Sequence, residues 1–199
     1  MRNYSNLTLG SDDPYATAHQ LQLRGRHEPE VRGLIGAWRW PGMYDNAEHL
    51  VPLAKAAYAV DLGGAAGPVG YRTMVVDYVH PERKTLWDIP GRADVIFCLH
   101  TLEHVEDAEL FLFTCAMKLK RGAPMVVLVP SNRNPHLHHR LWPHHRQTFH
   151  LGEEEAGPET RDLGELLSKA FDYTHSVGYT ANGNLMALVA NGEPEEAAD

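Results

Sequence analysis

The segment AVDLGGAAGPVGYRTMVVD, residues 59–77, places a glycine-rich loop between two short runs of β-branched residues. The pattern predicts a strand over 57–63, a loop, and a second strand over 72–79. A glycine-rich loop after a strand usually opens onto a helix whose N-terminus receives an anionic group. Only about three residues separate Gly70 from the second run. We therefore expect the helix of this first crossover to be shortened or absent.

Strands and helices alternate along the rest of the chain. The predicted elements are, in order, a helix over 46–57, a strand over 93–100, a helix over 106–122, a strand over 123–130 and a helix over 160–171. The segment 173–190 reads as two strands around Asn182-Gly183, a pair typical of a hairpin turn. The expected fold class is α/β, with a Rossmann-like, mostly parallel sheet and a C-terminal antiparallel hairpin.

Length and charge limit the class of protein. With 199 residues, the chain can form one domain with a full core. We expect this domain over 46–192, after an N-terminal extension or lid over 1–45 and before a disordered acidic tail over 193–199. The formal net charge of −8 disfavours a broad surface that tracks nucleic-acid phosphates. Cys98 and Cys115 lie in apolar runs and are interpreted as reduced core residues.

The sequence shows no sign of membrane insertion or secretion. Its apolar runs are too short to span a bilayer, and the first twenty residues lack the apolar core of a signal peptide. We expect a cytoplasmic protein that acts on a small molecule or a sugar, with nucleic acid an unfavoured partner.

The order of these elements, together with their motifs, resembles the class I S-adenosylmethionine-dependent methyltransferases over about residues 50–190. In that family the first strand ends in an acidic residue and a Gly-x-Gly-x-Gly-like loop. Here these fall on Asp61, Gly63, Ala65 and Gly67, with alanine in place of one glycine. S-adenosylmethionine carries no phosphate, so such a loop needs no helix dipole, and its glycines let the backbone pass close to the ligand.

The resemblance also implies how the cofactor is bound. The family's second strand ends in an acid that binds the ribose hydroxyls, matched by Asp77, and a later acid contacts the adenine amino group, matched by Asp88 in LWDIP. The cofactor is S-adenosylmethionine, and the implied binding residues are Asp61, Gly63, Gly64, Ala65, Gly67, Asp77, Tyr78, Asp88, Ile89 and Leu99.

A second motif, His100-x-x-Glu103-His104, follows the strand predicted up to residue 100. On one helical turn these side chains would share a face and could hold a divalent cation. The motif is similar to the Glu-x-x-Glu-His of metal-dependent O-methyltransferases, with histidine replacing the first glutamate. That replacement favours a softer transition metal over magnesium. His144 or His145, from the histidine-rich stretch 136–150, is the predicted additional ligand, and His145 is taken for the ligand set below.

Two chemistries remain open at this motif. A metal held by His100, Glu103, His104 and His145 would lower the pKa of an acceptor hydroxyl. Without a metal, His104 or His145 would act as the general base.

The leading hypothesis is O-methylation of a small-molecule or sugar hydroxyl. One alternative is an RNA terminal ribose 2′-O-methyltransferase, which the second motif favours and the acidic charge disfavours. The other is a non-catalytic, methyltransferase-like binding subunit, which the short crossover and Ala65 favour.

Overall fold

The computed structural model describes residue 43 and residues 46–64, 68–70, 72–77, 82–134, 146–152, 160–180 and 183–192. Its main sheet has six strands, in the spatial order β2 (Met74–Val76), β1 (Ala59–Leu62), β3 (Val95–Leu99), β4 (Pro124–Val129), β8 (Leu185–Ala190) and β7 (Tyr173–Tyr179). Strands β2, β1, β3 and β4 are parallel, and β8 is antiparallel to both β4 and β7. The predicted fold class is confirmed.

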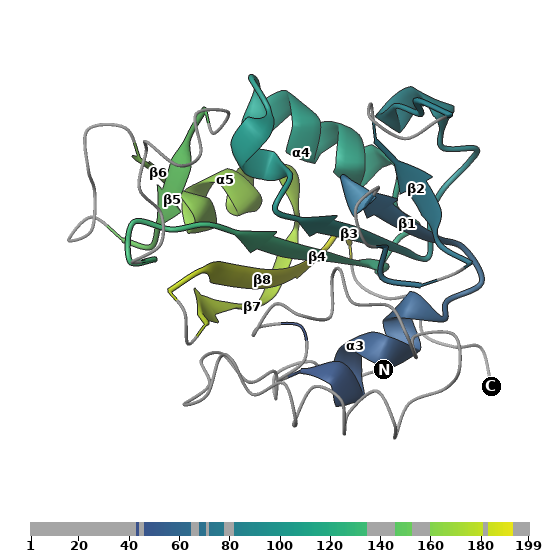
Figure 1. Ribbon diagram of the computed structural model, residues 1–199, viewed down its shortest axis with the longest axis horizontal. Helices are drawn as coiled ribbons and strands as arrows, with labels where there is room; N and C mark the ends of the chain where they lie inside the picture. The colour runs from purple at the N-terminus through teal and green to yellow at the C-terminus, as the bar shows by residue number, and fades with distance from the viewer. Residues whose placement is uncertain are drawn as a thin grey trace.

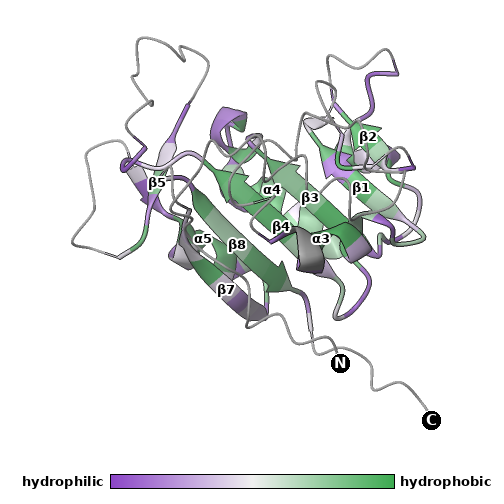
Figure 2. Cartoon of the chain, turned by 60° about the horizontal axis from the view of Figure 1, so that its bottom comes forward, coloured by the Kyte–Doolittle hydropathy of each residue, from purple (hydrophilic) through white to green (hydrophobic). Residues whose placement is uncertain are grey.

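The centre of the sheet is apolar because it is covered on both faces. Every residue of β1, β3, β4 and β8 is buried, and the last three strands are hydrophobic along most of their length (Figure 2). Continuous apolar runs are what strands buried on both faces require. Asp61 is the exception, a buried carboxyl near the end of β1.

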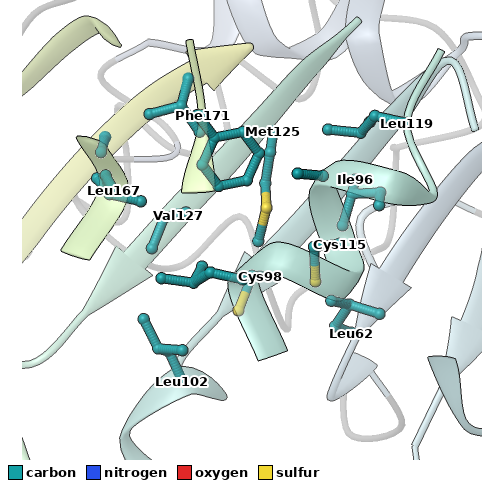
Figure 3. Close-up of a cluster of buried hydrophobic side chains, with 14 of the residues drawn as sticks. Leu62, Ile96, Cys98, Leu102, Cys115, Leu119, Met125, Val127, Leu167 and Phe171 are labelled. Carbon is teal, nitrogen blue, oxygen red and sulfur yellow. The ribbon is translucent and has the colours of Figure 1, made fainter. Parts of the chain in front are cut away.

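Helices cover the two faces of the sheet. Helix α3 (Ala47–Ala54) lies against one face, and α4 (Ala108–Met117) and α5 (Leu163–Ala170) lie against the other (Figure 1). The layer between the sheet and the α4–α5 side holds Cys98 and Cys115 among Leu, Met and Phe side chains (Figure 3). Both thiols are free and buried, as predicted, and burial raises the pKa of each.

One predicted helix begins later than expected. The first residues of the segment 160–171 form β6 (Thr160–Asp162), which pairs in parallel with β5 (Thr148–His150) in a separate two-stranded sheet. Helix α5 then begins at Leu163, because the Asp162 carboxylate accepts a hydrogen bond from the Glu165 N–H at 2.9 Å and caps it.

The crossovers on the β2 side of the sheet are short. In the described part of the first crossover, residues 63–64, 68–70 and 72–73, there is no α-helix. The described part of the next crossover, residue 77 and residues 82–94, contains only the 3-10 helix η3 (Leu86–Asp88). A second 3-10 helix, η4 (Leu102–His104), follows β3.

Several predictions concern residues outside this description. They include the extension over 1–45 apart from Met43, the tail over 193–199, and Ala65, Gly67, Tyr78 and His145. No helix within the described ranges is both long and apolar enough to cross a membrane.

Candidate functional site

The carboxyl end of β1 presents a buried acid. Asp61 is 1% exposed, and its Oδ2 accepts a hydrogen bond from the Val69 N–H at 2.9 Å. Within the described residues, its Oδ1 is buried and has no hydrogen-bond partner. Burial raises the pKa of Asp61 to about 7; the Val69 bond opposes this shift, and the charge of Asp77 adds to it. A buried oxygen without a partner is costly, so this atom suits a donor supplied by a ligand.

The two glycines after β1 lie against side chains of the protein, so a Cβ fits at neither position. Gly63 has φ +77°, and a Cβ there would collide with the Thr101 hydroxyl, which donates to the Leu62 carbonyl at 2.7 Å. A Cβ on Gly64 would lie 2.5 Å from Asp61 Oδ2. The backbone therefore passes closer to Asp61 and Thr101 than any other residue type allows.

Substituting Gly63 with alanine is expected to lower the free energy of unfolding by about 2–3 kcal/mol, from left-handed strain and loss of the Thr101 bond. Gly91→Ala is the matched control, because Gly91 has φ +70° but nothing lies within 4 Å of its Cβ position. It should cost only about 1 kcal/mol. Urea unfolding of both variants measures the difference; equal losses would show that Thr101 does not constrain the turn.

The other predicted cofactor residues divide into two groups. Asp77, directly after β2, is partly buried and close enough to Asp61 to affect its titration. Leu99 ends β3 and is 8% exposed. These two residues and Asp61 lie at neighbouring strand ends, where ligands bind in open parallel sheets.

Asp88 and Ile89 have contacts within the protein. Asp88 Oδ2 accepts hydrogen bonds from the Thr85 N–H at 2.7 Å and the Thr85 hydroxyl at 2.8 Å, and these bonds lower the Asp88 pKa. The bond from the Thr85 N–H belongs to the capping box of η3. Ile89 is 1% exposed, and its carbonyl accepts a hydrogen bond from Lys118 Nζ at 2.9 Å. This placement gives no support to a cofactor contact by the Ile89 side chain.

At the end of β3, a histidine and a glutamate form a buried pair. His100 Nδ1 lies 3.3 Å from Glu103 Oε1, and the Glu103 side chain is fully buried while that of His100 is 18% exposed. His100 has φ +51°, a left-handed conformation uncommon for a residue other than glycine. Backbone strain of this kind persists where surrounding contacts hold it, often at functional sites.

The C-terminal hairpin supplies a third member that the sequence motifs did not indicate. Asn184, 1% exposed, places its Nδ2 3.4 Å from His100 Nε2, and its Oδ1 accepts from Asn134 Nδ2 at 2.7 Å. The His100 ring is thus held between a carboxylate and a carboxamide. If the Glu103 carboxylate accepts from Nδ1–H, the lone pair of the neutral ring is on Nε2 and faces Asn184.

Arg146 and Gln147 hold η4 in place through hydrogen bonds to its backbone carbonyls and to that of the residue after it. Gln147 Nε2 donates to the carbonyls of Leu102 and Val105 at 3.0 and 3.1 Å, and the Arg146 N–H donates to the Glu103 carbonyl at 2.8 Å. Because these contacts satisfy the backbone of the turn, Glu103 keeps a defined position beside His100.

The predicted metal ligands are not all brought together. Glu103 is buried while His104, the next residue of η4, is exposed, so the two side chains do not share a face. Within the described ranges, no group of three or more His, Cys, Asp or Glu side chains is arranged to hold a metal ion. His145 lies outside those ranges.

Comparison with known proteins gives information on fold. No protein-family model matches the sequence, and no curated protein matches it. Among solved structures, the Burkholderia thailandensis 1,6-didemethyltoxoflavin-N1-methyltransferase with bound S-adenosylhomocysteine is similar, with TM-score 0.52 and 15% identity over 74% of this chain and 76% of that one.

Two further similar structures are more distant. One is the magnesium protoporphyrin IX methyltransferase from Synechocystis PCC 6803 with bound SAM, with TM-score 0.49 and 11% identity over 91% of this chain and 94% of that one. The other is the pyocyanin biosynthetic protein PhzM, with TM-score 0.45 and 16% identity over 76% of this chain and 56% of that one. The chain thus spans little more than half of PhzM. The first likeness shows that the chain has the class I fold of S-adenosylmethionine-dependent methyltransferases.

Proposed function

We propose that this protein is an S-adenosylmethionine-dependent methyltransferase whose acceptor is a hydroxyl group of a small molecule or a sugar. The observation that carries the proposal is Asp61, a buried carboxyl at the end of β1 whose Oδ1 has no partner among the described residues. It lies under a turn whose two glycines exclude any Cβ. A ligand with a donor group and close backbone contact fits this arrangement.

The donors of S-adenosylmethionine match the acceptors at these strand ends. Its α-ammonium group can donate to Asp61, and its ribose hydroxyls can donate to Asp77. Two carboxylates at one site would repel the phosphates of a dinucleotide, so the charge also favours a ligand without phosphate. When bound, S-adenosylmethionine supplies an electrophilic methyl group.

His100 is the residue to which we assign the role of general base. Glu103 accepts from Nδ1–H and stabilises positive charge on the ring, which leaves Nε2 as the proton acceptor. The contact of Nε2 with Asn184 is long, 3.4 Å against about 2.9 Å for a typical bond, so an acceptor hydroxyl can replace it. His104, an expected base, is exposed and less suited, and His145 remains a prediction.

Treatment with a chelator separates this base from the metal-assisted alternative. Both nitrogens of the His100 ring already contact side chains of the protein, so we expect methyl transfer to survive EDTA with less than about a twofold loss. Loss of activity that added manganese or zinc restores would instead identify a metal site, with His145 as its additional ligand.

Methyl transfer itself tests the proposed function. The protein is incubated with S-adenosylmethionine and phenol, catechol and monosaccharide acceptors, and S-adenosylhomocysteine formation is measured. We expect turnover with at least one hydroxyl compound, a loss of about 100-fold or more in His100→Gln, and little change in His104→Gln. Cofactor binding without turnover would favour the non-catalytic alternative, and turnover only with an RNA 3′ end would favour the ribose methyltransferase.

A further inference from the structure

Helix α4 carries three large apolar side chains on its solvent side, next to the exposed Glu109. Leu110, Phe113 and Met117 are 60%, 53% and 46% exposed. Their spacing of three and four residues places them in one stripe along the helix. The buried side of the same helix consists of Ala108, Leu112, Thr114, Cys115 and Ala116. Apolar side chains on the solvent side of a helix are normally covered, and among the described residues this stripe stays exposed.

Charges of opposite sign flank the two ends of this stripe. Glu106 and Asp107 are exposed just before α4, and Lys120 and Arg121 are exposed just after it. When two copies of the helix lie antiparallel, the negatively charged end of each copy faces the positively charged end of the other. A register centred beside Phe113 sets Leu110 against Met117 of the second copy, and Glu106 and Asp107 against its Arg121 and Lys120.

From this juxtaposition we propose that α4 is the contact of a homodimer, in which two copies of the chain pair antiparallel across a two-fold axis beside Phe113. Such an interface is isologous, because each copy presents the same patch. Antiparallel pairing also sets the positive end of each helix dipole beside the negative end of the other. The proposal goes beyond methyl transfer and does not depend on it.

The ion pairs at the helix ends within one chain do not oppose this pairing. Glu106 lies 3.6 Å from Arg146 in an exposed pair, and Lys120 lies 2.6 Å from the partly exposed Asp94. Surface pairs contribute little, about 0–1 kcal/mol, so their charges can face a second chain. The net charge of −8 gives long-range repulsion between copies, which salt near 0.15 M screens beyond about 8 Å. We expect a dimer with micromolar affinity that is weaker at low salt.

Sedimentation velocity on the full chain over a range of concentrations tests the dimer. We expect the mass to rise from that of one 22.3-kDa chain to twice that value. Phe113→Glu should weaken association by at least about tenfold, because it places a charge beside the axis. Trp87→Glu is the matched control: among the described residues Trp87 is the most exposed large apolar one, at 72%, and it lies outside α4, so this variant should associate as the parent does.

Two further variants test the antiparallel register. Phe113→Cys should form an intermolecular disulfide under mild oxidation, because the proposed axis brings the two copies of residue 113 together. The native cysteines are buried and do not compete. Glu106→Arg and Arg121→Glu should each weaken the dimer, and the double variant should restore it. A chain that stays monomeric at every concentration would overturn the proposal, as would a dimer that Phe113→Glu leaves intact.

Discussion

Asp61→Asn is expected to make the protein more stable near pH 8 and, in the same variant, to abolish binding of S-adenosylmethionine. The folded-state pKa of Asp61 is about 7, against an ordinary value of 3.8. Between these values the folded chain binds more protons than the unfolded chain, so stability falls as the pH rises through this window. An amide carries no such penalty. We expect a gain of about 2 kcal/mol near pH 8, reduced from the full shift by the cost of burying the new NH₂ group.

The gain should disappear near pH 4, where the parent carboxyl is protonated and pays no desolvation cost. Thermal melts of parent and variant at several pH values measure it, and the expected shift near pH 8 is about 4–8 °C for a chain of this size. Asp94→Asn is a suitable control, because Asp94 is a partly exposed acid whose partner, Lys120, lies on the surface. Equal or lower stability of Asp61→Asn near pH 8 would contradict an uncompensated buried charge.

Glu103→Ala is expected to lower the free energy of unfolding by about 3 kcal/mol and to abolish methyl transfer. Its carboxyl group is fully buried and lies 3.3 Å from the His100 ring. Removal of one member of a buried pair leaves the other unsatisfied and opens a cavity. The His100 base would also lose the group that orients it and stabilises its positive charge. Turnover should therefore fall by more than the loss of folded protein alone explains.

Two variants separate these contributions. Glu103→Gln keeps the shape and can still accept from His100, so it should cost only about 1 kcal/mol while removing the charge that supports the base. His104→Ala, at the exposed next position, should change stability by less than about 0.5 kcal/mol. Urea unfolding and turnover are measured on the same preparations. A Glu103→Ala protein with parental stability and activity would contradict the assigned role of the pair.

The sheet could be predicted from the sequence because its signals are local. The β-branched runs of β3 and β4 need no partner to be recognised, and the Asn182-Gly183 pair indicates a hairpin by turn geometry alone. The resemblance to the methyltransferase family matched Asp61, Gly63 and Asp77 to an acid, a glycine turn and a second acid, and the predicted strands placed them at neighbouring strand ends. These features follow from backbone chemistry within a few residues.

The contacts that complete the candidate site depend on tertiary structure. Asn184 approaches His100 only because β8 lies beside β4, which brings together residues 84 positions apart. Thr101 fills the space left by Gly63 because β3 pairs with β1. Helical spacing alone placed His100, Glu103 and His104 on one face, but the segment forms a 3-10 turn that buries Glu103 and leaves His104 exposed.

Tertiary contacts also decide which residues of helix α4 face solvent and why β6 is a strand. Sequence spacing identified a helix rich in apolar residues, but which of them face solvent depends on how it lies on the sheet. The residues of β6 read as the start of a helix, and only pairing with β5 holds them extended. These conformations depend on contacts with residues distant in the sequence, so no local pattern predicts them.

Calorimetric titration of the parent chain with S-adenosylmethionine, near pH 6 in two buffers of different ionisation enthalpy, tests the central claim most directly. At that pH the Asp61 carboxyl is mostly protonated in the free protein, since its pKa is about 7. If Asp61 accepts the cofactor's ammonium group, binding should be saturable, with one site and release of nearly one proton, and Asp61→Asn should show no binding heat. The absence of saturable heat in either buffer would contradict a cofactor site at the end of β1.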